Sequence, residues 1–193
     1  GTLTFNPVIN SISPAATNYT SAQNLSVSTS GVGTLSYQWA KSTDAGASWS
    51  DIPGATSSTY SNVSSNGLYR CTVTNSNASV QSQVNLTFNP ELTVQPPSGN
   101  KISAVALNSV TGSGVGSLTY TWYKVGSPDS VVSTSISVPG SYYCLVSNSN
   151  GTTRAPSSSS SYSFTFNPEA TNTLPGNSNQ GNVLTFTVNS ASS

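Results

Sequence analysis

The 193-residue chain is almost without ionisable side chains. It has no histidine, five Lys plus Arg and five Asp plus Glu, so 5% of its residues are charged and the net charge is zero. Soluble domains ordinarily carry about 25% charged residues. Five scattered cations cannot build the basic patch that nucleic-acid binding requires. Solubility must come from neutral polar groups, because Ser, Thr and Asn make up nearly half of the chain.

The missing residue types also exclude several kinds of chemistry. Without histidine a Ser-His-Asp triad is impossible, and a zinc site loses its commonest nitrogen ligand. Asp44 and Asp51 bracket one loop, but they offer too few oxygen ligands for a convincing calcium site. We therefore expect no catalytic residues, no cofactor and no metal. A surface with so few titrating groups should also keep its stability over a wide pH range.

Two further absences concern targeting. No apolar run approaches the 18 residues of a membrane-spanning helix, so we expect no membrane span. The chain has no methionine and no signal peptide. It opens directly into the strand-like Thr2–Phe5, which indicates a processed or excised polypeptide.

What the chain does contain is one motif in two copies. A Tyr-x-Trp run precedes a Gly-x-Tyr-x-Cys segment at 37–73 and again at 120–146. In an immunoglobulin-like sandwich the Trp packs between the sheets, and the Tyr two residues before the Cys forms a tyrosine corner. We predict an all-β chain of two tandem immunoglobulin-like β-sandwiches with extra terminal strands. Its structural residues are Trp39, Tyr69, Cys71, Trp122, Tyr142 and Cys144.

The two cysteines are not predicted to pair. The strand positions that hold the second Cys in antibody-type domains are occupied by Leu25 and Leu107. Cys71 and Cys144 fall in separate domains, too far apart for the roughly 7 Å that a disulfide permits between Cα atoms. We expect two buried free thiols, with a disulfide to another chain as the alternative.

A second repeat marks the domain boundaries. Leu3–Pro7 returns as Leu86–Pro90 and again as Phe164–Pro168. Each is a strand end closed by Asn-Pro, because proline has no N–H to donate and restricts the residue before it. The predicted organisation is an N-terminal strand at 1–7, domains at 8–88 and 89–166, and a C-terminal tail with an extra strand at 167–193.

In the second domain the alternation of apolar residues predicts particular elements. Strands are expected at 102–107 and 131–138, in the positions of strands B and E. The run Ser157–Ser161 is predicted to be a flexible, exposed loop.

The predicted end strands have no sandwich of their own. An unpaired alternating strand is a template for another chain. Either the polypeptide belongs to a longer array of repeats, or its end strands pair with neighbouring copies by donor-strand complementation. The candidate donor residues are Leu3, Phe5, Val183, Leu184, Phe186 and Val188.

Asparagine also supplies candidate modification sites. An Asn-x-Ser/Thr sequence is the acceptor for N-linked glycans. The chain has six, although its composition alone would produce about as many. They are Asn18, Asn24, Asn62, Asn77, Asn85 and Asn150.

Taken together, Gln38-Trp39, Ile52–Tyr60 and the Gly67–Cys71 motif resemble the tandem Ig-like modules of prokaryotic surface proteins and phage virions. The resemblance covers residues 8–166, although the second domain lacks the Pro-Gly-Ala-Thr segment. The low charge, the abundant Ser, Thr and Asn and the unpaired end strands are similar to archaeal thread-type pilins. That resemblance implies a glycosylated, extracellular filament subunit at the cell surface, whose partners are copies of itself joined head to tail.

Two other functions remain open. The chain is alternatively a virion decoration or adhesin module that binds cell-surface glycans through loop aromatics such as Trp49 and Tyr19. It is alternatively a fragment of a long Ig-like spacer array.

Overall fold

The computed structural model describes residues 5–167, 169–172 and 186–189. These residues form β-strands joined by turns, with a single 3-10 turn, η1, at Leu107–Ser109. The chain divides into two compact units: Gly1–Glu91 with Ser113–Leu118 and Ser147–Thr153, and the remaining residues. Among the described residues no helix is long and apolar enough to cross a membrane. The predicted fold class, tandem immunoglobulin-like sandwiches, is confirmed.

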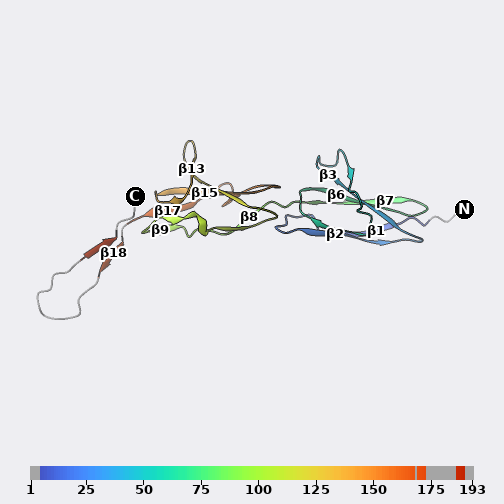
Figure 1. Ribbon diagram of the computed structural model, residues 1–193, viewed down its shortest axis with the longest axis horizontal. Helices are drawn as coiled ribbons and strands as arrows, with labels where there is room; N and C mark the ends of the chain where they lie inside the picture. Colours follow the sequence, from blue (N-terminus) through green and yellow to red (C-terminus); the bar gives the residue numbers. More distant parts are fainter. Residues whose placement is uncertain (1–4, 168, 173–185, 190–193) are drawn as a thin grey trace, which may run out of the picture. The chain divides into compact units, whose positions relative to one another are not determined.

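The first unit is a two-layered sandwich (Figure 1). One layer has the strand order β1-β2-β5 and the other β4-β3-β6-β7, with antiparallel pairing throughout. The strands are β1 (Val8–Ser13), β2 (Gln23–Ser30), β3 (Ser36–Ser42), β4 (Ser50–Asp51), β5 (Thr59–Val63), β6 (Gly67–Thr74) and β7 (Ser79–Leu86).

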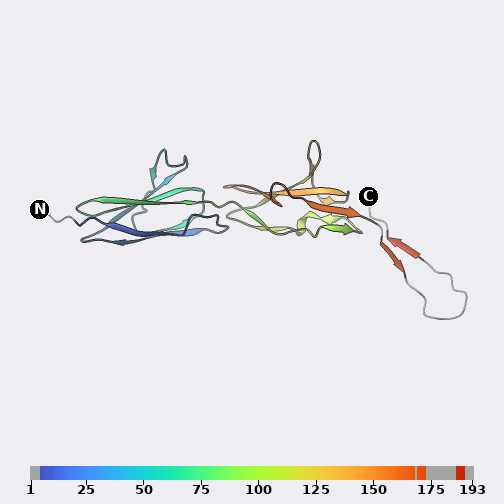
Figure 2. The same cartoon turned by 180° about the vertical axis from the view of Figure 1, so that it is seen from behind.

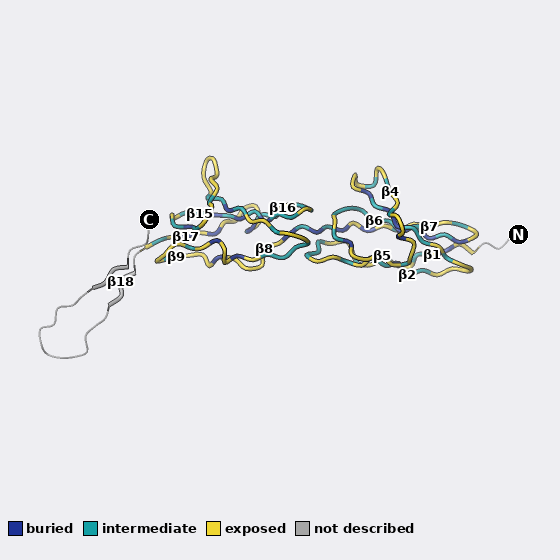
Figure 3. Tube along the Cα trace, in the orientation of Figure 1, coloured by how far each residue is buried: buried dark blue, intermediate teal, exposed yellow. Residues whose placement is uncertain are grey.

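The core of the first unit follows from the alternation of its strands. Along β6 the residues Tyr69, Cys71 and Val73 are buried while their neighbours are partly exposed, as a period of two requires. Trp39 lies directly opposite Cys71 and is fully buried, as is Leu25 from the other layer. In Figure 3 the residues coloured as buried lie along the strands, interspersed with partly exposed ones. Each such side chain contributes about 1.5–3 kcal/mol when fully buried.

The second unit repeats this plan less regularly (Figure 2). Its main sheet has the order β13-β12-β15-β17-β9, with β9 parallel to β17 and β16 paired to β15. Two short pairs, β10 with β14 and β8 with β11, complete the strands of this region. The strands are β8 (Glu91–Val94), β9 (Gly99–Lys101), β10 (Val105–Ala106), β11 (Thr111–Ser113), β12 (Thr119–Lys124), β13 (Ser130–Val132), β14 (Ser135–Ile136), β15 (Gly140–Asn148), β16 (Gly151–Ala155) and β17 (Tyr162–Phe166).

Two expectations for this unit need correction. The predicted strand at 102–107 is only the two residues of β10, followed by η1. The predicted strand at 131–138 is two strands, β13 pairing with β12 and β14 pairing with β10. The reason is burial: Ile136 is buried, but Thr134 and Val138, which would lie on the same face of one continuous strand, are exposed, so no single apolar face runs through the segment. The loop predicted at 157–161 is exposed as expected, and the Arg154 guanidinium donates to the carbonyl oxygens of Pro156, Ser157 and Ser160.

The C-terminal tail contains a strand pair. β18 (Glu169–Asn172) is antiparallel to β19 (Phe186–Asn189), with Ala170 opposite Val188. The predicted extra strand of the tail is therefore present over the described part of 183–188.

Candidate functional site

The tryptophan-tyrosine-cysteine motif forms the interior of each unit. Tyr69 donates its hydroxyl to the carbonyl oxygen of Ser65 at 2.7 Å, and Tyr142 donates to that of Val138 at 2.6 Å. Both are tyrosine corners. The indole N–H of Trp39 donates to the carbonyl oxygen of Ser57. These residues hold the sheets together and present no reactive group to solvent.

The two thiols are buried and unpaired. Cys71 and Cys144 are both fully buried. Burial raises the pKa of each thiol to about 11. A thiol at neutral pH in such a site is neither a nucleophile nor exposed for a bridge to another chain.

Asn75, in the turn after β6, builds the first copy of what we call the end motif. In this motif an Asn amide ties a Phe-Asn-Pro segment to a neighbouring loop. The side chain of Asn75 donates to the carbonyl oxygens of Phe5 at 2.7 Å and Val32 at 3.2 Å. Its own oxygen accepts from the backbone N–H groups of Asn77 and Ala78. One side chain thereby satisfies four backbone groups and fixes the turn after β6.

The second copy of the end motif uses the same atoms in the same roles. Asn148 donates to the carbonyl oxygens of Phe88 at 3.0 Å and Val115 at 3.2 Å. Its oxygen accepts from the N–H groups of Asn150 and Gly151. All five residues belong to the first unit.

Close backbone packing accompanies both copies. A Cβ placed on Gly31 would lie 3.2 Å from the Cα of Pro7, and one placed on Gly114 would lie 3.2 Å from the Cα of Pro90. Glycine at each position lets the Asn-Pro segment lie close, since a Cβ there would press on the proline backbone. The repetition of hydrogen bonds and packing shows that the end motif is a defined structural feature.

The two copies differ in how far they are completed. Phe88 is fully buried, and its N–H donates to the side-chain oxygen of Asn66 at 2.6 Å. The next N–H, of Asn89, donates to the side-chain oxygen of Asn18 at 2.8 Å. Phe5, in the first copy, is 51% exposed. Within the described residues, the end motif at Phe5 has its loop half, and the sandwich that buries Phe88 accompanies the second copy.

The candidate donor residues are only partly within the described chain. Leu3, Val183 and Leu184 lie outside it. Phe5 is held through its carbonyl oxygen by Asn75 and Asn77. The remaining two candidates, in β19, pair with β18 of the same chain: Phe186 opposite Asn172 and Val188 opposite Ala170.

Hydrogen bonding separates the candidate glycan acceptors. Asn18 and Asn150 are half-buried, and their amide nitrogens donate to carbonyl oxygens, those of Asn89 and Ser64 respectively. Asn77 is exposed, but its amide donates to the carbonyl oxygen of Phe5.

Three acceptors remain accessible: Asn24, Asn62 and Asn85. The Asn24 side-chain oxygen accepts from the backbone of Asn62, which leaves its nitrogen available. Asn85 lines a hollow of about 460 Å³ that also includes Leu68 and Asn66. A glycan replaces one of the two amide hydrogens, which these three positions can spare; at Asn18 both hydrogens are engaged, by the Asn89 carbonyl and by Glu91.

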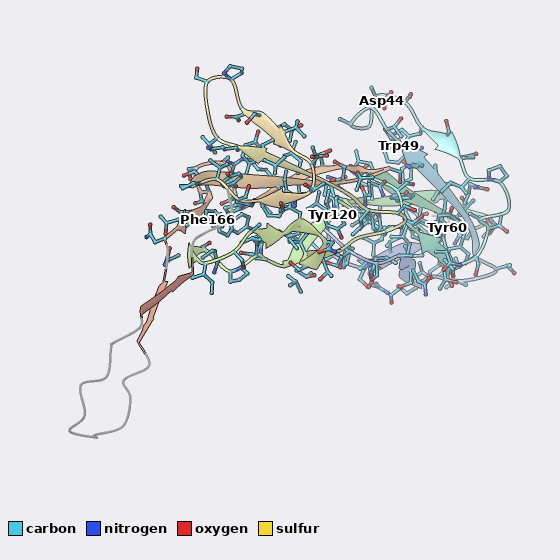
Figure 4. The ribbon with its side chains drawn as sticks, turned by 60° about the vertical axis from the view of Figure 1, so that its left-hand side comes forward. Asp44, Trp49, Tyr60, Tyr120 and Phe166 are labelled. Atoms are coloured by element: carbon cyan, nitrogen blue, oxygen red, sulfur yellow. The ribbon has the colours of Figure 1, made fainter. Side chains whose placement is uncertain are left out.

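The two loop aromatics are less accessible than glycan-binding side chains should be. Trp49 precedes β4, is half-buried, and donates its indole N–H to the carbonyl oxygen of Gly46 (Figure 4). Tyr19 donates its hydroxyl to Ala15, and its ring lies 6.3 Å from that of Phe88.

The loop acid Asp44 is engaged locally. Hydrogen bonds from Ser48 and Ser42 lower its pKa to about 2. Within the described residues no three His, Cys, Asp or Glu side chains are grouped as metal ligands would be.

Sequence reasoning missed the two asparagines that organise the end motif. Asn75 and Asn148 each begin an Asn-Ser-Asn triplet four residues after the cysteine of their repeat. This shared triplet was the available signal.

A family model matches part of the chain. Residues 8–90 match the family model described as Domain of unknown function (DUF8696). No curated protein matches the chain.

Solved structures of Ig-domain proteins resemble it weakly. The N-terminal four Ig domains of Dscam1 isoform 1.9 are 17% identical with a TM-score of 0.40, over 84% of this chain and 46% of that one. A variant of titin domains I67–I69 is 18% identical with a TM-score of 0.37, over 84% and 66%. Extracellular domains 3–5 of Drosophila OTK are 19% identical with a TM-score of 0.32, over 74% and 57%. The aligned part thus spans about half to two thirds of those chains, and similarity at this level carries nothing about activity.

Proposed function

We propose that the chain is a structural segment of an extracellular filament or surface array, in which Ig-like modules are joined end to end. The observation that carries the proposal is the end motif, built twice from identical hydrogen bonds around Phe5 and Phe88. A motif that recurs with the repeat is a connector between successive modules. Its half-formed copy, with Phe5 exposed, is suited to receive another sandwich.

The surface chemistry fits an extracellular structural role. Neutral polar side chains replace charges over the chain, and three glycan acceptors are sterically accessible at Asn24, Asn62 and Asn85. Glycans at these positions would add hydrated bulk without disturbing a buried hydrogen bond.

The donor-strand form of the proposal assigns Leu3 and Phe5 to a sandwich of a neighbouring copy. Their counterparts Leu86 and Phe88, at the end of β7, are fully buried in the first unit, so the same peptide should be buried wherever a sandwich lacks the end of its last strand. In the described residues each unit has its own last strand, β7 or β17. A donated strand would therefore have to pair with the neighbouring copy at a place other than the last-strand position of these two sandwiches.

Sedimentation velocity and negative-stain microscopy of the purified chain test the filament form. Head-to-tail assembly should appear as the concentration rises, and Phe5→Asp should abolish it. Val8→Asp is the matched control, because Val8 is also 51% exposed. A strictly monomeric chain at all concentrations rejects self-assembly and leaves the array form.

An extended chain tests the end-to-end connection itself. A second copy of residues 8–85 placed directly before Leu3 would finish its last strand with Leu3, and Phe5 would take the place of Phe88. The added residues should fold, giving a proportionate gain of strand signal in circular dichroism and resistance to protease. Rapid digestion of the added copy alone would reject the connection.

A further inference from the structure

Arg70, in β6 of the first unit, has a buried polar atom without a partner. Its neighbours Tyr69 and Cys71 face the core, so its side chain lies on the outer face of the sheet. The Nε atom is buried and makes no hydrogen bond, and the side chain has no ion pair with any described residue. The guanidinium lies over the ring of Trp49, with Cζ 4.1 Å from the ring centroid. This stacking fixes the plane of the guanidinium and leaves its N–H donors, which point along that plane, to be satisfied by something else.

The second unit shows that such a stack does not require an unsatisfied arginine. Tyr143 occupies the position corresponding to Arg70, between the corner tyrosine and the cysteine. Arg154 lies over the ring of Tyr143, again with Cζ 4.1 Å from the centroid. There the guanidinium donates to three carbonyl oxygens. The available donors are a specific property of Arg70.

A small polar hollow adjoins this arginine. It measures about 250 Å³ and is lined by Arg70, Gln81, Ser82 and Gln83. Gln83 lies directly opposite Arg70 in the β6–β7 ladder, and Gln81 lies two residues further along the same face. Gln81 donates to the hydroxyl of Thr72, which leaves its amide oxygen as an acceptor.

The charge of Arg70 is not neutralised within the sheet. Asp51 lies in the same cross-strand row, through Ala40, but it is two strands away, about 10 Å across the sheet. No ion pair joins the two side chains in the described part of the chain. A rigid guanidinium with available donors matches the two oxygens of a carboxylate.

We propose that this hollow binds a carboxylate-bearing sugar, such as a uronic acid. Arg70 would hold the carboxylate, Gln81 and Gln83 would bond the ring hydroxyls, and Trp49 would keep the guanidinium plane fixed. A sugar fits better than an acidic peptide, because one cation stands among neutral amides and the hollow holds about one sugar ring. This binding site goes beyond the structural role proposed above.

Titration of the full chain with D-glucuronate, followed through the indole N–H signal of Trp49 by NMR, tests the proposal. Glucuronate should bind at least about tenfold more tightly than D-glucose, since hydrogen bonds to a charged group contribute about 1.5–3 kcal/mol. Arg70→Gln should weaken glucuronate binding at least about tenfold, and Arg70→Lys should weaken it less. Lys101→Gln removes a positive charge in the second unit and should change nothing.

Three results would overturn the proposal. These are glucose binding as tightly as glucuronate, N-acetylglutamate binding as tightly as glucuronate, and an unchanged affinity in Arg70→Gln. The first result would show that the carboxylate is not recognised, the second that the sugar ring is not recognised, and the third that Arg70 is not part of the site. An unshifted indole signal of the buried Trp39 reports that a variant is folded. If Arg70→Gln does not fold, Arg70→Lys still allows the comparison.

Discussion

Single side chains that join a buried ring to one polar contact stabilise the interior of each sandwich. Tyr69 and Tyr142 are both 2% exposed, and each bonds a backbone oxygen four residues earlier. The hydroxyl closes the turn before the strand while the ring fills the core. Its loss leaves a partly buried carbonyl without its donor.

Tyr69→Phe and Tyr142→Phe should each lower the unfolding free energy by about 1 kcal/mol, the usual net contribution of a hydrogen bond. Urea denaturation measures this. Tyr120→Phe is the control, because Tyr120 is more exposed and its hydroxyl bonds no described residue. Equal losses in all three variants would show that the tyrosine corners contribute nothing of their own.

The buried thiols set the alkaline limit of stability. Burial raises the pKa of Cys71 and Cys144 from 9.0 to about 11. Above pH 9 the unfolded thiol ionises and the folded thiol does not, so stability is full below pH 9 and lost as the pH rises toward 11.

At the acid end, the hydrogen bonds of Asp44 lower its pKa from 3.8 to about 2. The stability from these bonds is present above pH 3.8 and lost as the pH falls through 2. Urea midpoints should therefore be flat from about pH 4 to 9 and should fall on both sides. A steep fall of the urea midpoint between pH 7 and 4 would contradict the view that stability is insensitive to pH because the chain has no histidine.

Among the structural elements, the turn after the cysteine strand carries the end motif. Asn75 connects this turn to the chain start, and Asn148 does the same for Phe88. In both, an amide is needed because its nitrogen must donate to carbonyls while its oxygen accepts from N–H groups.

Asn75→Asp separates these two functions. The carboxylate keeps the acceptor for Asn77 and Ala78 but faces the carbonyl oxygens of Phe5 and Val32 with no hydrogen to donate. The unfolding free energy should fall by about 1–3 kcal/mol. Ser76→Asp adds the same charge at the exposed neighbouring residue and should have little effect. If the two variants lose the same stability, charge and not the amide geometry is responsible.

The strands of the first unit could be predicted because their apolar residues alternate over long stretches, as in β6 and β7. The short strands β10 and β14 could not, because a two-residue strand has no period to detect. Partners of Asn75 and Asn148 were invisible for another reason: backbone carbonyls contributed by distant loops leave no mark in the sequence. Arg70 likewise looks like an ordinary strand residue in the sequence, because the lack of hydrogen-bond partners for its guanidinium is visible only in the structure.

For the molecule as a whole, the accessible surface decides where glycans can be carried. Peptide mass spectrometry of native protein should find N-glycans confined to Asn24, Asn62 and Asn85. Occupancy at Asn18 would contradict the account, because its amide nitrogen donates to both the Asn89 carbonyl and Glu91, and a glycan would replace one of these two hydrogens.

The central claim is that the exposed end at Phe5 is a connector that another sandwich completes. Its most direct test is the effect of Phe5→Ala on the unfolding free energy, measured in this chain and in the chain extended by a second copy of residues 8–85. Phe5 is half-exposed here, so the loss should stay below about 1 kcal/mol, whereas in the extended chain it should reach the 3–5 kcal/mol typical of a buried phenylalanine. Phe88→Ala supplies the reference for a completed connector. An equally small loss in both chains would contradict the claim.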